Sequence, residues 1–273
     1  LQSAKSQRVP TMTQLVDLIA INELLGTVES SGDGKNANLV AQLETESLAA
    51  KAAEFQTTNN DDTIGWIRIP NTNVDYPVVY KAGVENYAYY ESKGYDKQYS
   101  KDGVIWADYE CTFPELSQNT TLYGHNWHNI YTPRTQANMQ ANDLMFSLVM
   151  SYNYTDFAQE NPFIYFSTTE QDYVFQVFAS YYTDLNFGYN YAQMSQEDFQ
   201  KVIAEAKAKS LSNYNVPVTS EDKIVTLSTC TRVHGNTNNQ RFVVMAKLVP
   251  VGTPSTTIST HSNPIAYNSS IDA

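Results

Sequence analysis

The sequence predicts a mainly β fold, α+β by content, in which eight short strands form a barrel or a sandwich. Twenty Tyr and eleven Phe among 273 residues favour strands, because aromatic side chains fit a pleated, half-buried surface. Short apolar runs recur along the chain with turn-forming residues between them, a pattern typical of barrels and sandwiches. The runs cover residues 64–70, 74–80, 103–108, 120–124, 163–167, 173–183, 223–230 and 241–249.

Helical periodicity precedes the strands. Residues 14–28 place Leu15 and Leu18 close to a 3.6-residue period, and a Ser- and Gly-rich turn follows. A second helix is predicted over about 38–56, where leucines recur among Ala, Glu and Gln. The two segments predict a helical hairpin, over residues 1–60, that packs on the strands.

Two further helices are predicted within the strand region. Ser195 and Asp198 form a capping-box pattern, and Phe199 and Ile203 begin an apolar stripe behind it. A shorter helix is predicted over 142–150. The strand region, 61–250, is therefore expected to be one domain, followed by a polar tail over 251–273 that reads as loosely packed.

Composition excludes several classes of protein. The net charge of −12 argues against a nucleic-acid partner, which would need clustered Lys and Arg. No apolar run reaches the ~18 residues of a membrane span, and no signal peptide is recognisable. We expect an ectodomain whose membrane anchor is absent from this sequence. Two cysteines do not make a disulfide framework, and we expect neither a metal nor a cofactor.

A thiol and a guanidinium stand at the facing ends of the last two predicted strands. Cys230 closes the run 223–230, and Arg241 opens the run 241–249. Alternation places Cys230 on the face opposite Leu227, and Arg241 on the face opposite the apolar series that begins with Phe242. If the apolar faces line the interior of a barrel, Cys230 and Arg241 point outward and meet where the strands pair.

This pair predicts cysteine-dependent acyl transfer. A thiol nucleophile needs a base or a cation that stabilises its thiolate, and a guanidinium can hold a developing negative charge. Among the histidines, His125 is favoured because it ends a predicted strand, where a side chain is held rigidly. His128 and His234 lie in loops and are weaker candidates, and His261 lies in the tail.

Three segments of the sequence resemble the signature segments of sortases, the cysteine transpeptidases of Gram-positive surfaces. They are Tyr-Gly-His-Asn at 123–126, Thr-Leu-Ser-Thr-Cys at 226–230 and Arg-Phe-Val-Val at 241–244. The sequence of 62–79, the N-terminal hairpin and the helix before the cysteine strand resemble class B. The resemblance covers about 62–250 and implies an eight-stranded sortase-type β-barrel.

The resemblance also implies a mechanism. Cys230 would attack a sorting motif of a surface protein or pilin to give a thioacyl-enzyme, with His125 as acid and base and Arg241 on the substrate carbonyl or oxyanion. The acceptor would be an amine of a cell-wall precursor or a pilin Lys, so wall anchoring and pilin polymerisation both remain open. The enzyme would act on the extracellular face of the Gram-positive cell membrane.

Other residues near the cysteine are open to two interpretations. Ser228 and Thr231 flank Cys230, where substrate contact and ordinary strand or turn usage are equally compatible with the sequence. The tyrosines of 181–191 could line a peptide groove, but packing at a strand end is favoured. Cys111, in a predicted loop, is interpreted as structural.

Two alternative functions are compatible with parts of the sequence. Residues 228–232 loosely resemble the Ser-x-Gly-Cys-x-Arg element of L,D-transpeptidases, which cross-link peptidoglycan, but the Gly is missing. A non-enzymatic β-rich surface or adhesin module is the second alternative, and it predicts no special reactivity at Cys230.

Overall fold

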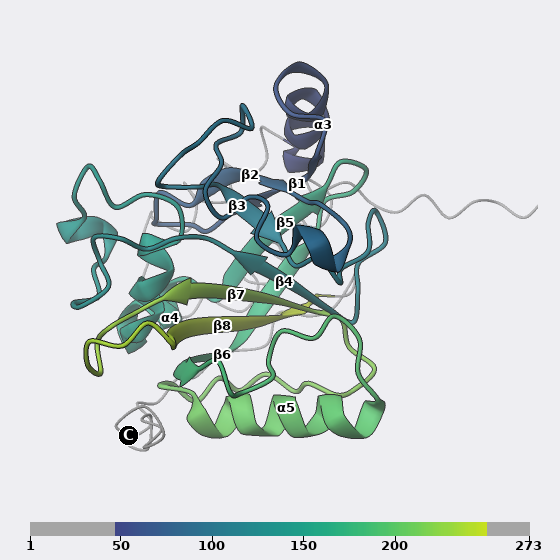
Figure 1. The fold of residues 1–273 in the computed structure, drawn as a ribbon. Coiled ribbons are helices and arrows are strands. Elements are labelled where there is room, and N and C mark those ends of the chain that lie inside the picture. The colour runs from purple at the N-terminus through teal and green to yellow at the C-terminus, as the bar shows by residue number, and fades with distance from the viewer. Residues whose placement is uncertain (1–46, 250–273) are drawn as a thin grey trace, which may run out of the picture.

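The computed structural model describes residues 47–249, in which eight strands form a closed barrel. The strand order around the barrel is β1-β2-β3-β4-β7-β8-β6-β5, and β5 returns to pair with β1 (Figure 1). Two pairs, β2 with β3 and β4 with β7, are parallel, and the other pairs are antiparallel. The predicted mainly β fold is confirmed, and it is a barrel rather than a sandwich.

Each predicted apolar run overlaps one strand, and the boundaries agree to within two residues. The strands are β1 (Thr63–Arg68), β2 (Asp75–Val79), β3 (Ile105–Ala107), β4 (Asn119–Tyr123), β5 (Phe163–Thr168), β6 (Val174–Asp184), β7 (Ile224–Cys230) and β8 (Gln240–Leu248). The described helices are α3 (Leu48–Thr58), α4 (Thr155–Glu160) and α5 (Gln196–Lys209), with three short 3₁₀ helices, η1 (Val84–Asn86), η2 (Gln136–Asn138) and η3 (Ser147–Asn153).

Helix α3 covers one side of the barrel (Figure 1). Its buried Leu48 and Ala52 form an apolar cluster with Trp66 of β1 and with Phe163 of β5. The helix overlaps the second half of the predicted N-terminal hairpin. The other predicted helix of that hairpin, and the tail over 251–273, lie outside the described residues.

Helix α5 confirms the prediction made from its cap and its apolar stripe. The hydroxyl of Ser195 accepts a hydrogen bond from the backbone N–H of Asp198 (3.1 Å), which satisfies one free donor of the first turn. Phe199 and Ile203 are buried, and the helix packs against β6 on the side of the barrel away from α3 (Figure 1). The chain then continues into β7, as expected.

The helix predicted over 142–150 is only partly present: residues 142–146 are not helical, and the 3₁₀ helix η3 begins at Ser147. Met145 has a φ of 53°, in the left-handed region that a continuous right-handed helix does not permit. The carboxylate of buried Asp143 accepts hydrogen bonds from the guanidinium of Arg134 (2.7 Å) and from the backbone N–H of Gln140 (2.8 Å). These bonds fix a turn, after which the chain enters η3 and then α4. The sequence did not predict α4.

The connection between β6 and α5 covers the sheet face that carries Cys230 and Arg241. The Tyr189 and Ser228 hydroxyls hydrogen-bond at 2.8 Å, and Asn190 donates to the hydroxyl of Tyr123 (2.9 Å). Strand β7 is consequently buried on both faces except at its last residue. The alternation correctly predicted a shared face, but that face is open only at its Cys230 end.

Within residues 47–249, no helix combines the length and apolar character needed to cross a bilayer.

Candidate active site

Cys230 and Arg241 are direct partners in the antiparallel ladder between β7 and β8. Both side chains are partly exposed, and they line the same cavity. The Nη1 group of Arg241 donates to the backbone oxygens of Asn238 and Gln240, each at 2.9 Å. A guanidinium carries five N–H donors, so these two bonds anchor Arg241 and leave donors on its other nitrogens.

His125 reaches the same place from the neighbouring parallel strand. Tyr123, the last residue of β4, lies opposite Ser228 of β7, so two further residues along each strand bring His125 level with Cys230. Side-chain bonds continue this alignment past the end of β4. Thr229 donates to the carbonyl of Gly124 (2.7 Å), and Asn126 donates to that of Cys230 (3.3 Å). Neighbouring strands lie ~4.8 Å apart, so the two residues are adjacent.

Gly124 holds the strand end in close packing. A Cβ atom added there would lie 2.5 Å from Cδ1 of Ile105 and 2.6 Å from Cγ of Phe146. The glycine in the Tyr-Gly-His-Asn segment therefore lets β4 approach the core directly before His125.

The cavity that contains the three residues has a volume of about 290 Å³. Its walls also include Glu91, Asp108 and Tyr189. A larger hollow of about 570 Å³ lies elsewhere, between Glu110–Gln118 and the start of α5, and it contains none of the three. The chemistry of the side chains, rather than the size of the hollow, therefore selects the smaller cavity as the candidate site.

The imidazole of His125 is held by neighbours from the β2–β3 segment, from β3 and from its own loop. Its Nε2 lies 2.6 Å from the backbone oxygen of Glu91. A carbonyl oxygen only accepts, so Nε2 carries a proton, and Nδ1 is the basic nitrogen of the neutral ring. The rings of Trp106 and Trp127 lie 5.7 Å and 5.0 Å from the imidazole between centroids. The ring is thus fixed in both orientation and tautomer.

Polar groups in the cavity wall satisfy one another. The Asp108 carboxylate accepts hydrogen bonds from the hydroxyl of Tyr123 (2.7 Å) and from the backbone N–H of Glu110 (2.9 Å). Burial raises the pKa of Asp108 above its usual value in spite of these bonds. Burial also raises the pKa of Tyr189, although its hydrogen bond to Ser228 and the charge of nearby Arg241 both act to lower it.

Comparisons with known proteins agree with this site. A sequence model of the sortase domain matches residues 67–249. The chain belongs to the sortase family.

Relatives and solved structures similar to this chain include class B sortases. Sortase B of Staphylococcus aureus is 31% identical over 193 residues, which are 70% of this chain and 72% of that protein. Sortase B of Listeria monocytogenes is 29% identical over 191 residues, 70% of this chain and 71% of its own length. The structure of a Staphylococcus aureus sortase B–substrate complex matches with a TM-score of 0.62 and 27% identity, over 80% of this chain and 92% of that one. The structure of Clostridium perfringens sortase B matches with a TM-score of 0.59 and 26% identity, over 72% of this chain and 98% of that one.

The protein is therefore a class B sortase, a cysteine transpeptidase. Its relatives come from Gram-positive bacteria, where sortases act at the cell envelope, and one similar structure is a complex with a substrate. The L,D-transpeptidase and adhesin alternatives are not favoured, since neither accounts for the match to the sortase domain.

The structure places three of the remaining candidate residues of this sortase, Cys111, His128 and His234, outside the cavity. Cys111 is buried and unbridged, and burial raises the pKa of its thiol to about 12. His128 is exposed, while His234 packs edge-on against Tyr182 at 4.5 Å between ring centroids. Neither histidine lines the cavity, and His261 lies outside the described residues.

The two expected substrate contacts differ in their placement. Ser228 lines the cavity, although its hydroxyl is buried against Tyr189. Thr231 is buried, donates to the backbone oxygen of Ile130 (3.1 Å) and does not line the cavity. Among the tyrosines of 181–191, Tyr189 lines the cavity, whereas Tyr181 packs in the core.

Sequence reasoning missed two residues of the cavity wall, Glu91 and Asp108. Glu91 belongs to the irregular segment between β2 and β3, and Asp108 directly follows the short strand β3. The one available signal was that Asp108 is the last residue of the strand predicted over 103–108. Among the described residues, no group of three or more His, Cys, Asp or Glu side chains is placed to hold a metal ion.

Proposed function

We propose that Cys230 is the nucleophile of this sortase, His125 its general acid and base, and Arg241 the donor that stabilises the oxyanion. The observation that carries the proposal is register. The β4–β7 and β7–β8 pairings bring His125 and Arg241 to either side of Cys230, at the open end of one sheet face. Nucleophile, proton carrier and charge stabiliser are the three parts that acyl transfer requires.

In the first half of the reaction, the Cys230 thiol gives its proton to His125, and its sulfur attacks the carbonyl carbon of the scissile peptide bond. A C–S bond forms, and the carbonyl oxygen takes negative charge, which Arg241 stabilises by donating hydrogen bonds. The C–N bond then breaks as His125 gives a proton to the leaving amine. The product is a thioester between Cys230 and the sorting-motif fragment.

In the second half, an amine acceptor attacks the thioester. His125 takes the proton of the incoming amine, a new amide bond forms as the C–S bond breaks, and Cys230 leaves as a thiolate that recovers its proton from His125. The substrate would be a surface protein or pilin with a sorting motif, and the acceptor a wall-precursor amine or a pilin Lys. The site would face the outside of a Gram-positive cell membrane.

The position of Arg232 favours sortase roles over those of an L,D-transpeptidase. In the L,D-transpeptidase interpretation, the arginine two residues after the cysteine belongs to the motif. Here Arg232 donates to Tyr131 (3.3 Å) and Asn238 (2.6 Å) and does not line the cavity. Arg241 does line it. A sorting peptide assayed against peptidoglycan stem peptides separates the two functions.

His125→Ala is expected to lower the rate of transpeptidation by about 10²–10⁴-fold, the usual contribution of general acid–base catalysis. The matched control is His128→Ala, three residues along the chain, because His128 is exposed and outside the cavity. The measurement is kcat/KM for a cleaved sorting peptide. Equal rates for the two variants would remove His125 from the mechanism.

A further inference from the structure

The segment between β2 and β3, residues 80–104, contacts His125 at two points. It provides the Glu91 oxygen that lies 2.6 Å from Nε2. It also provides Gly103, where a Cβ atom would lie 2.9 Å from Cδ2 of the imidazole, and whose φ of 60° suits glycine. Tyr87 and Ala88 of the same segment line the cavity. The position of this segment therefore determines where the imidazole lies.

Tyr90, adjacent to Glu91, anchors the segment to the barrel. Its side chain is 1% exposed and packs with Val79 and Val104. Its hydroxyl donates to Oδ2 of Asp62 (2.6 Å) and accepts from the side-chain amide of Asn60 (3.2 Å). The residue that holds the segment in place is thus one peptide unit from the carbonyl that contacts His125.

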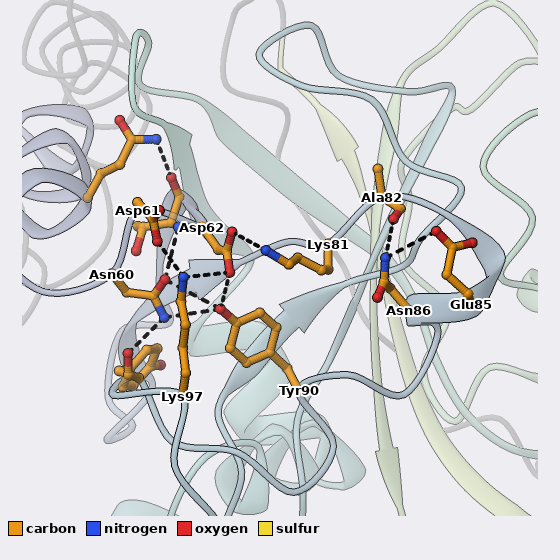
Figure 2. A network of polar contacts seen from close by, with 12 residues as sticks. Asn60, Asp61, Asp62, Lys81, Ala82, Glu85, Asn86, Tyr90 and Lys97 are labelled. Atoms are coloured by element: carbon orange, nitrogen blue, oxygen red, sulfur yellow. Dashed lines mark hydrogen bonds and ion pairs between the residues drawn. The ribbon is translucent and has the colours of Figure 1, made fainter.

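Asp62, just before β1, is the centre of a polar network that includes this anchor. Lys81, Lys97 and Tyr90 converge on its carboxylate (Figure 2). The Nζ atoms of Lys81 and Lys97 lie 2.8 Å and 3.0 Å from its oxygens, and Lys97 also pairs with Asp61. Burial alone would raise the pKa of Asp62, but the hydrogen bonds from these partners hold it below its usual value.

The network joins both ends of the segment to one point. Lys81 lies at the start of residues 80–104 and Lys97 toward the end, and Tyr90 lies between them. Because all three contact Asp62, the carboxylate draws the segment against the end of α3 and the start of β1. Asp62 precedes residue 67, where the match to the sortase domain begins, so that match assigns it no role.

We propose that Asp62 and Tyr90 are positioning residues for His125. By fixing Tyr90, Asp62 fixes the Glu91 carbonyl, which holds the imidazole in its Nε2–H tautomer and leaves Nδ1 as the basic nitrogen. The proposal deepens the proposed function, because it gives this tautomer to the histidine assigned there as acid and base. Without the anchor, the Glu91 carbonyl moves, and the ring exchanges between tautomers and orientations.

The test is ¹⁵N NMR of the histidine side chains in the full chain, with the His125 signals assigned by their loss in His125→Gln. The native protein is expected to show His125 as the Nε2–H tautomer at a pH where the ring is neutral. Tyr90→Phe keeps the buried ring but removes the donor to Asp62, and Asp62→Asn removes the carboxylate charge. Both variants are expected to show averaged Nδ1 and Nε2 shifts, the signature of mixed tautomers.

The matched control is Tyr152→Phe. Tyr152 is a fully buried tyrosine whose hydroxyl donates to the backbone oxygen of Asn161 (2.8 Å), and it does not line the cavity. Tyr152→Phe loses one buried hydrogen bond, as Tyr90→Phe does, so both substitutions are expected to lower the thermal stability of the protein. The His125 signals should remain those of the native protein.

Steady-state kinetics provide a second readout. Tyr90→Phe is expected to lower kcat by about tenfold with little change in KM for the sorting peptide, because a displaced catalytic group affects the chemical step. The Tyr152→Phe control should retain the native kcat. A loss confined to stability, with kcat unchanged, would assign Asp62 and Tyr90 a structural role only.

The NMR result also separates this inference from the proposed function. Native His125 signals in both Tyr90→Phe and Asp62→Asn would overturn the positioning role, whatever the activity. Native activity of His125→Ala would instead overturn the catalytic role of the histidine. The NMR comparison of the native protein with Tyr90→Phe and Asp62→Asn would still show whether these residues fix the tautomer of His125.

Discussion

Cys230→Ala is expected to abolish transpeptidation, with a loss of about 10⁴-fold or more in kcat, because removal of a nucleophile eliminates the covalent route. Cys230→Ser is expected to be nearly as inactive, since a hydroxyl beside the same imidazole is a much weaker nucleophile than a thiol at neutral pH. The measurement is the release of the C-terminal fragment from a sorting peptide, with purified variants of equal thermal stability.

The chain supplies its own control for this substitution. Cys111, its other cysteine, is buried with a pKa raised to about 12, so it is not reactive as a thiolate at neutral pH. Cys111→Ala is expected to retain activity, and a methanethiosulfonate reagent should label Cys230 alone. An active Cys230→Ala variant, or inactivation that requires Cys111, would contradict the assignment of the nucleophile.

Arg241→Ala is expected to lower kcat by about 10²–10³-fold, or about 2.7–4 kcal/mol, which is the usual loss when one oxyanion donor is removed. Arg241→Lys should also be poor, because an ammonium lacks the planar fork of a guanidinium. Its Nη1 anchoring to Asn238 and Gln240 fixes that fork beside Cys230, and a lysine cannot reproduce both the anchor and the free donors. The measurement is kcat and KM for the same peptide.

Arg232→Ala is the control for Arg241. Arg232 lies in the loop that precedes β8 and also makes polar contacts, but it lies outside the cavity. Its loss is therefore expected to change kcat by less than about threefold, as for a surface substitution. Equal losses for the two variants would indicate a general effect of positive charge near the site rather than oxyanion stabilisation.

The strands could be predicted from the sequence because each is short, apolar and bounded by turn residues. Helix α5 could be predicted because Ser195 and the Phe199 stripe act within a few residues. The first part of the helix over 142–150 was mispredicted because Arg134, which binds the Asp143 carboxylate, lies nine residues earlier in the chain. Met145 then adopts a positive φ.

The residues of the candidate site likewise divide into those that local sequence patterns predict and those that they do not. Cys230 and Arg241 could be paired from the sequence because alternation and strand order place them together, and the structure shows that pairing. His125 required the parallel neighbour β4, whose place beside β7 depends on the closure of the barrel. Glu91 and Asp108 were not predicted, because irregular backbone between β2 and β4 brings them to the cavity and no periodicity describes such a path.

The most direct test of the proposed mechanism is intact-mass spectrometry of the full chain incubated with a library of sorting peptides. The mechanism predicts a mass increase equal to the N-terminal fragment of a cleaved peptide, mapped to Cys230 and discharged by hydroxylamine or by candidate amine acceptors. The adduct should be absent from Cys230→Ala and present in Cys111→Ala. An adduct on Cys111, or no adduct on Cys230 with any peptide of the library, would contradict the account.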